Sequence, residues 1–130
     1  MPGSLLPDTN AFIALLRGHP IVVDMLDSAS EVVLSAVVLG ELTYGAMNSR
    51  ATDANLKRLQ DLRAECRFAP VDEAVVTSYG QVRLALKQKG RPIPENDIGI
   101  AATAIANGAV VLTEDLHFRE IEGLVLAQFR

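Results

Sequence analysis

Short apolar runs alternate along the chain with longer stretches in which apolar residues recur every three or four positions. The short runs predict strands, and the longer stretches predict amphipathic helices between them. Gly18, Pro20 and Gly90 mark three of the helix boundaries. The predicted strands cover residues 4–7, 32–34, 68–71, 109–112 and 124–126, and the predicted helices cover residues 12–16, 20–29, 35–47, 52–66, 72–89 and 98–106.

This alternation of strands and helices is typical of an α/β protein with a parallel sheet covered on both faces. At 130 residues, the chain is too short to divide into two well-buried cores. We therefore expect residues 1–130 to form a single domain. Ser35 and Asp72 are good helix-capping residues, and each precedes one of the predicted helices.

Small residues predict close packing at two of the helices. Residues 98–106 are apolar all round, so this helix should be buried, and its Ala and Gly residues allow close backbone approach. Gly40 and Gly45 each make their own helix less favourable by roughly 1 kcal/mol, which suggests that another element packs tightly against them.

The cysteine content and the chain start indicate a cytoplasmic location. Cys66 is the only cysteine, which excludes an internal disulfide and fits a reducing compartment. The opening Met1-Pro2-Gly3-Ser4 lacks the basic region of a signal peptide. No stretch approaches the ~18 apolar residues that a membrane span needs, so we expect no membrane segment.

The net charge is −4, from 16 acidic and 12 basic residues. A negative protein is poorly suited to binding nucleic acid through its phosphates. That objection weakens if several acids surround a divalent cation, because phosphate then approaches the metal. The placement of the acids therefore decides how the charge is interpreted.

Two acids follow predicted strands. Asp8 ends the first strand, and Asp115 comes just after the fourth. Ligands of parallel sheets bind outside the carboxyl ends of the strands, so both acids should lie at the same edge. Helix capping is the alternative role for the segment Asp8-Thr9-Asn10, since all three residue types cap helices well.

Two further acids lie within predicted helices. Glu41 has mostly apolar neighbours at helical spacing and should lie on or beside a buried stripe; the alternative is a buried ion pair. Asp97 adjoins the buried helix at its first turn, where the helix dipole favours the ionised carboxylate. Four acids from four segments indicate an all-oxygen site, which suits Mg²⁺ or Mn²⁺. With no His/Cys cluster for zinc, we interpret His19 and His117 as surface residues.

Four segments carry these acids: Leu6-Pro7-Asp8-Thr9-Asn10; Glu41-Leu42-Thr43-Tyr44-Gly45; Ile93-Pro94-Glu95-Asn96-Asp97 followed by Ile100-Ala101-Ala102; and Thr113-Glu114-Asp115 with Phe118. In this order and spacing they span nearly the whole chain. Together they resemble PIN domains, and most closely the VapC toxins of VapBC toxin–antitoxin pairs.

The resemblance implies a three-layer α/β/α sandwich around a small parallel sheet of four or five strands. It implies a Mg²⁺- or Mn²⁺-dependent ribonuclease that forms a homodimer and is inhibited by a VapB-like antitoxin whose tail enters the catalytic groove. By position, Asp8, Glu41 and Asp97 match the three core acids. Asp115 matches the fourth, which is sometimes Asn in relatives. The matching supporting polar residues are Thr9, Asn10 and Thr113.

In the implied mechanism, the acids hold a metal that lowers the pKa of a bound water, and the resulting hydroxide attacks phosphorus. Thr9 or Thr113 is expected to orient the water or the phosphate. The expected products carry a 5′-phosphate and a 3′-hydroxyl. The candidate RNA-binding residues at the rim are Arg17, Arg50, Arg83, Lys87, Lys89 and Arg91.

Three other functions fit part of the pattern. A receiver-like, phospho-accepting signalling domain has a similar size and also uses carboxylates with Mg²⁺, but it needs an acid pair after the first strand and a lysine after the last. A phosphatase of the haloacid-dehalogenase type needs an aspartate where Asn10 stands. A catalytically silent PIN binding module is the other alternative; the four retained acids argue against it.

Overall fold

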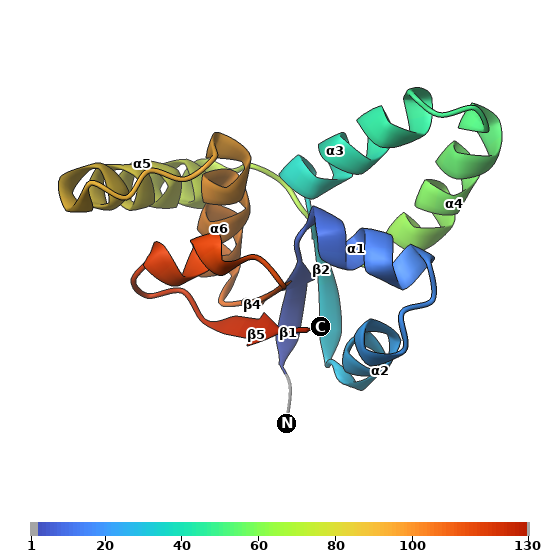
Figure 1. Cartoon of the computed structure of the whole chain (residues 1–130), viewed down its shortest axis with the longest axis horizontal. Helices are drawn as coiled ribbons and strands as arrows, with labels where there is room; N and C mark the ends of the chain where they lie inside the picture. Colours follow the sequence, from blue (N-terminus) through green and yellow to red (C-terminus); the bar gives the residue numbers. More distant parts are fainter. Residues whose placement is uncertain (1–2, 130) are drawn as a thin grey trace.

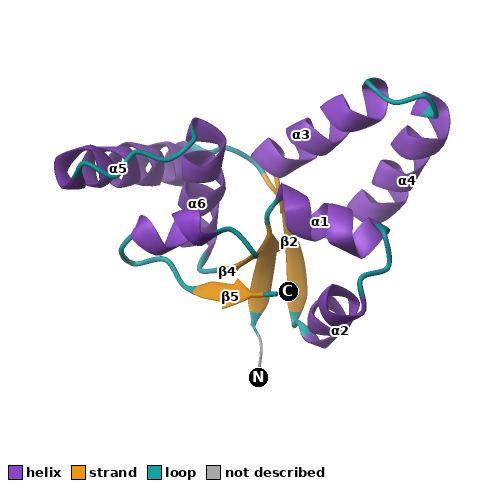
Figure 2. Cartoon of the chain, in the orientation of Figure 1, coloured by secondary structure: helices purple, strands orange, loops and turns teal. Residues whose placement is uncertain are grey.

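A computed structural model describes residues 3–129 of the chain. Five parallel strands form one sheet in the order β3-β2-β1-β4-β5, and six α-helices within these residues flank it (Figures 1 and 2). The predicted α/β class with a small parallel sheet is therefore confirmed. Met1, Pro2 and Arg130 lie outside the described residues. The single-domain organisation of residues 1–130, and the signal-peptide argument from Met1-Pro2, stay predictions.

The strands form where the apolar runs predict them; the first has its predicted bounds, and the other four differ by one or two residues at each end. The third strand ends before its predicted limit because Pro70 has no N–H to donate to a neighbouring strand. The last strand begins two residues later than predicted. The strands are β1 (Ser4–Pro7), β2 (Glu31–Ser35), β3 (Arg67–Ala69), β4 (Val110–Thr113) and β5 (Leu126–Gln128).

Four of the six α-helices in the described residues begin at a side-chain cap, and two end at glycine. Ser35 and Asp72 accept the capping hydrogen bonds predicted for them, and Gly90 and Gly108 end their helices with positive φ. A 3₁₀ helix, η1 (Leu116–Glu120), was not predicted. The helices are α1 (Thr9–Leu16), α2 (Pro20–Ser28), α3 (Ala36–Met47), α4 (Thr52–Glu65), α5 (Glu73–Lys89) and α6 (Glu95–Asn107).

Helices cover both faces of the sheet, because successive strand residues point to opposite sides. Leu5 of β1 packs in one apolar cluster with residues of α1 and α2. Leu6, the next residue, packs in a second cluster with residues of α3, α4, α5 and α6. In Figure 1, α5 and α6 lie to one side of the central strands, and the α3–α4 hairpin lies to the other. The two apolar clusters, one on each face of the sheet, give the predicted three-layer sandwich.

The buried helix α6 packs closely against α3. A Cβ atom added to Gly99 would lie 3.1 Å from Val37 Cγ2, so a larger residue there would require the Val37 side chain to move. The predicted close packing at Gly40 and Gly45 is wrong, since a Cβ at either position would meet nothing within 4 Å. Both glycines lie on the exposed side of α3, where no element covers them.

The strand order puts β1 beside β4 at the centre of the sheet, where the connections change direction. The crevice outside the carboxyl ends of such a strand pair is where ligands of open α/β sheets bind. Asp8 follows β1 and Asp115 follows β4, so both lie at this edge, as predicted. Within residues 3–129, no helix is both long and apolar enough to cross a membrane.

Candidate metal centre

Four acidic side chains from four elements gather beyond the carboxyl ends of β1 and β4. Asp8 caps α1 and Asp115 caps η1, while Glu41 lies within α3 and Asp97 in the first turn of α6. Burial is the main cause of the raised pKa values of Asp8 and Asp97, and neighbouring acids add to it: Asp97 and Asp115 for Asp8, and Asp115 and Glu41 for Asp97. The structure therefore brings together all four acids that the sequence singled out.

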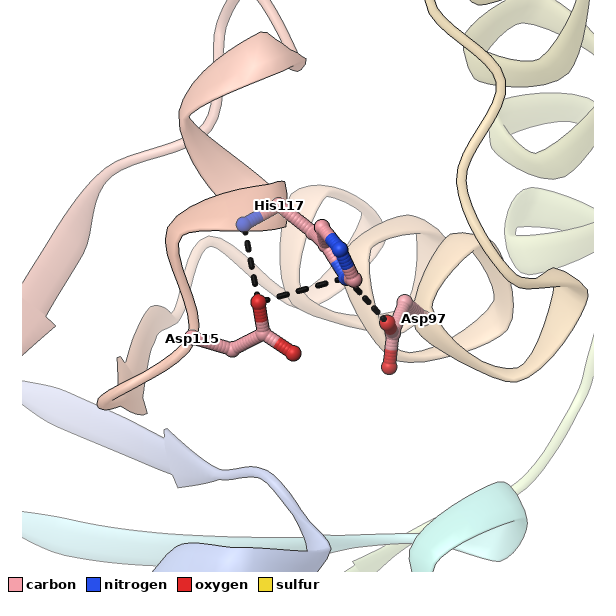
Figure 3. A group of neighbouring side chains, drawn as sticks. All are labelled: Asp97, Asp115 and His117. Carbon is pink, nitrogen blue, oxygen red and sulfur yellow. Dashed lines mark hydrogen bonds and ion pairs between the residues drawn. The ribbon is translucent and has the colours of Figure 1, made fainter.

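The tightest part of this group is formed by Asp97, Asp115 and His117 (Figure 3). One possible ligand atom of each lies within 4.8 Å of the others. His117 Nδ1 is 3.2 Å from Asp115 Oδ1 and 3.7 Å from Asp97 Oδ2. The imidazole therefore lies beside both carboxylates, although more than half of the His117 side chain is exposed.

Asp8 is the most buried of the acids, with 5% of its surface exposed. Its Oδ1 accepts a hydrogen bond from the backbone N–H of Ala11 at 2.8 Å, and its Oδ2 accepts one from Thr113 Oγ1 at 2.5 Å. Thr113 Oγ1 in turn accepts from the backbone N–H of Asp115 at 2.9 Å. Asp8 therefore caps a helix, as the alternative interpretation expected, and is also tied to Asp115.

Glu41 is held by neutral donors from two other elements. Thr9 Oγ1 donates to its Oε1 at 2.6 Å, and Asn96 Nδ2 donates to its Oε2 at 2.8 Å. The alternative of a buried ion pair is wrong, because Glu41 pairs with no cation in the described part of the chain. Both carboxylate oxygens are nevertheless fixed in direction.

The threonine hydroxyls contact the acids directly. Each hydroxyl has a single proton, and Thr9 and Thr113 both donate it to a carboxylate. They therefore orient the acids; that either also orients water or phosphate stays a prediction. Asn10 is exposed, and its side chain forms no hydrogen bond within residues 3–129.

The four carboxylates of the acidic group have no Lys or Arg as a counter-charge among the described residues, and His117 is the basic side chain beside Asp97 and Asp115. Burial raises the pKa of Asp8, and the hydrogen bond from Thr113 opposes this. Burial also raises the pKa of Asp97, and the charge of Asp115 adds to the effect. Partly buried carboxylates without a counter-charge are suited to a bound cation.

A cleft of about 320 Å³ opens beside Glu41, between α1, α3 and α4. Thr9 and Glu41 line one part of it, and Arg17 and Arg58 line another. Arg17 was among the predicted rim residues, whereas Arg58 was not. Two other predicted rim residues are engaged in ion pairs, Arg83 with Glu95 and Arg91 with Glu120.

Sequence reasoning missed two residues that contact the four acids. Asn96 adjoins Asp97, and His117 follows Asp115 by two residues, so closeness to a predicted ligand was the available signal in both cases. His117 is exposed as predicted, but it contacts the acids. His19 is partly buried and caps α2, with Nδ1 accepting from the backbone N–H of Val22.

Residues 5–124 match the family model described as "PIN domain". Curated relatives cover nearly the whole chain. Ribonuclease VapC2 of Rickettsia felis is 30% identical over 124 residues, which are 92% of this chain and 92% of the relative. Ribonuclease VapC5 of Mycobacterium tuberculosis is 32% identical over 127 residues, covering 94% of this chain and 90% of the relative.

Solved structures of VapBC proteins are also similar to this chain over nearly its whole length. The chain is similar to a chain in the crystal structure of VapBC2 from Rickettsia felis bound to a promoter DNA fragment, with a TM-score of 0.89 and 27% identity over 98% of this chain and 99% of the other. VapBC from Salmonella typhimurium gives a TM-score of 0.88 and 28% identity, covering 98% of both chains. The sequence match, the sheet order and the edge at which the acids gather agree, and the chain belongs to the PIN-domain family.

Proposed function

We propose that this protein is a metal-dependent endoribonuclease that acts as the toxin of a type II toxin–antitoxin pair. Relatives named as VapC ribonucleases match over 90% of the chain, which supports the activity. The observation that carries the proposal is the group of four carboxylates, none of which pairs with Lys or Arg within residues 3–129. The PIN-domain fold argues against the receiver-like alternative.

Asp8, Glu41, Asp97 and Asp115 would hold the cation. Their donor atoms are all carboxylate oxygens, which fits Mg²⁺ or Mn²⁺ better than zinc. When bound, a divalent cation supplies activation of water and stabilisation of charge on the phosphate. The expected products keep a 5′-phosphate and a 3′-hydroxyl.

The protein's own residues hold the acids and attract the substrate. Thr113 fixes Asp8, and Thr9 fixes Glu41. Arg17 and Arg58 line the cleft beside Glu41, where positive charge can offset the phosphates of an RNA strand. The negative net charge is therefore compatible with RNA binding, because the positive groups are local to the cleft.

The proposal includes two protein partners. Solved relatives are described as VapBC complexes, which supports a VapB-like antitoxin as the inhibitor of this chain. Homodimerisation, which the family resemblance implies, stays a prediction that light scattering on the purified protein can test. The proposal also places the protein in the cytoplasm, where its RNA substrate is found.

Cleavage of RNA by purified protein tests the proposal directly. We expect Mg²⁺ or Mn²⁺ to support cleavage and EDTA to abolish it. Asp8→Asn and Asp97→Asn should fold and lose activity, whereas Glu95→Gln, which changes an exposed acid in the same turn as Asp97, should keep it. Wild-type protein that leaves RNA intact with both metals would support the silent binding module instead.

A further inference from the structure

The imidazole of His117 lies among the donor atoms of the metal centre. Its Nδ1 is 3.2 Å from Asp115 Oδ1 and 3.7 Å from Asp97 Oδ2 (Figure 3). The backbone N–H of His117 also donates to Asp115 Oδ1 at 2.9 Å. One residue of η1 therefore both orients the Asp115 carboxylate and places a nitrogen next to it.

These separations are close to those of three ligands of one six-coordinate cation. Bonds of about 2.1 Å put neighbouring ligand atoms about 3.0 Å apart and opposite ligand atoms about 4.2 Å apart. The measured 3.2 Å is close to the separation of neighbouring ligand atoms, and 3.7 Å lies between the two separations. All three donor atoms lie within 4.8 Å of one another, so the side chains would have to draw closer to surround one ion.

An imidazole ligand changes which ion a carboxylate centre prefers. Mg²⁺ takes oxygen donors and keeps much of its water, whereas imidazole nitrogen is a common ligand of transition metals. Mn²⁺ is a transition ion that also accepts carboxylate and water. Adding an imidazole to this centre should therefore raise the affinity for Mn²⁺ much more than the affinity for Mg²⁺.

We infer that His117 is a ligand of the cation held by Asp97 and Asp115, and that it makes the centre selective for Mn²⁺ over Mg²⁺. This inference rests on the metal centre of the proposed function and adds a nitrogen donor to its oxygen ligands. Because the ring is largely exposed, it can turn toward a bound ion without disturbing the core.

The competing role for His117 is that of a positive counter-charge. A protonated ring between Asp97 and Asp115 would occupy the position of the ion and repel it. Removal of the ring would then strengthen binding of both Mn²⁺ and Mg²⁺, or leave it unchanged. A ligand has the opposite signature, since its removal weakens binding of the ion that it prefers.

Pulsed electron paramagnetic resonance of bound Mn²⁺ tests the inference. Histidine nitrogen directly bound to Mn²⁺ gives a characteristic ¹⁴N coupling, and the chain has only two histidines, His19 and His117. We expect the coupling in wild-type protein and its loss in His117→Gln. The matched control is His19→Asn, which keeps a capping side chain at α2 and should keep the coupling.

Titration calorimetry supplies the second measurement. We expect His117→Gln to weaken Mn²⁺ binding about tenfold or more and to change Mg²⁺ binding less than twofold. Circular dichroism should show that the exposed substitution leaves the fold intact. Absence of the ¹⁴N coupling in wild-type protein with Mn²⁺ bound would overturn the inference. Equal or tighter binding of Mn²⁺ by His117→Gln would overturn it as well.

These measurements do not depend on RNA cleavage. If the protein shows the coupling but cuts no RNA with either metal, the ligand assignment stands and the proposed ribonuclease function fails. If it cuts RNA in Mn²⁺ and shows no coupling, the ribonuclease function stands and the role of His117 is overturned.

Discussion

At the scale of single residues, one buried hydroxyl connects two of the four acids. Thr113 Oγ1 donates to Asp8 and accepts from the backbone of Asp115, and the residue has no exposed surface. Burial raises the pKa of Asp8, and the hydrogen bond from Thr113 opposes that rise by favouring the ionised form. The hydroxyl should therefore support cation binding without touching the ion.

Thr113→Val tests this role because it keeps the shape of the side chain and removes the hydroxyl. We expect Mg²⁺ affinity to fall by about tenfold and the free energy of unfolding to fall by about 1–3 kcal/mol. Calorimetric titration and urea unfolding measure the two effects. Thr103→Val is the matched control, since Thr103 is equally buried but donates to the carbonyl of Gly99 within α6. Equal Mg²⁺ affinities of the Thr113 and Thr103 variants would contradict the assigned role.

Asn96 should act on Glu41 in a similar way. Its amide donates to Glu41 Oε2 from a different element, so Asn96→Ala leaves that oxygen free to turn away. We expect a loss of Mg²⁺ affinity of several-fold to about tenfold, with little change in stability because the contact is exposed. Asn48→Ala at the exposed end of α3 serves as the control. If both variants bind Mg²⁺ as tightly as wild type, Asn96 does not position Glu41.

At the scale of elements, the spacing between α3 and α6 sets the distance between Glu41 and Asp97. Gly99 allows this spacing, because a Cβ there would press on Val37 at 3.1 Å. Gly40 lies in α3 with open space around it. The two glycines therefore differ in packing while sharing the same low helix propensity.

Alanine substitutions at Gly40 and Gly99 separate the effect of helix propensity from the effect of close packing between α3 and α6. Gly40→Ala should raise the free energy of unfolding by up to about 1 kcal/mol through helix propensity alone. Gly99→Ala should gain less or lose stability, because Val37 must move, and Val37→Ala added to it should recover part of the loss. Thermal unfolding of the three variants and wild type measures the differences. Equal stabilisation by Gly40→Ala and Gly99→Ala would show that α3 and α6 are not tightly spaced.

Most elements of the fold could be predicted because the signals that define them are local. Ser35 and Asp72 cap their helices as expected, and the apolar runs form the strands. The 3₁₀ helix η1 escaped because a five-residue element has too few residues to show a period. The packing at Gly40 and Gly45 was misjudged because a glycine in the sequence does not reveal what faces it.

The four acids of the candidate site could be predicted because their signals, like those of the helices and strands, are local in the sequence. Position after a strand identified Asp8 and Asp115, and an unusual apolar setting identified Glu41 and Asp97. The contact between Asn96 and Glu41 spans 55 residues, so no local pattern could reveal it. The orientation of the His117 ring toward the acids likewise depends on the tertiary structure, so the sequence alone could not show it.

At the scale of the whole molecule, the acidic group should make the stability of the fold depend on pH and on bound metal. Asp8 and Asp97 have raised pKa values, mainly from burial, so they hold protons in the folded state at pH values where the unfolded chain has released them. Between 3.8, the ordinary pKa of an aspartate side chain, and the raised values, the folded state binds more protons. The contribution of these groups to stability therefore falls as the pH rises through that window.

Asp97→Asn should remove the contribution of the Asp97 carboxyl to the pH dependence of the free energy of unfolding. In EDTA at neutral pH, we expect the variant to be more stable than wild type by about 1 kcal/mol, because a partly buried charge beside Asp115 is gone. The difference should shrink as the pH falls and the wild-type carboxyl takes up its proton. Urea unfolding over a pH series measures it, and the comparison of the two proteins cancels opposing groups such as Glu31, whose pKa is lowered by Arg67.

Metal should reverse the order of stability. At a Mg²⁺ concentration about 100 times the dissociation constant, binding stabilises wild-type protein by about 2.7 kcal/mol, whereas a variant that cannot bind gains nothing. Wild type should then unfold at the higher temperature, and EDTA should restore the opposite order. If Asp97→Asn were less stable than wild type in EDTA, the carboxylate would be a structural group. If Mg²⁺ stabilised both proteins equally, the ion would bind elsewhere. If the order of stability reverses between EDTA and Mg²⁺ as expected, the Asp97 carboxylate destabilises the metal-free fold and stabilises the fold once a cation is bound.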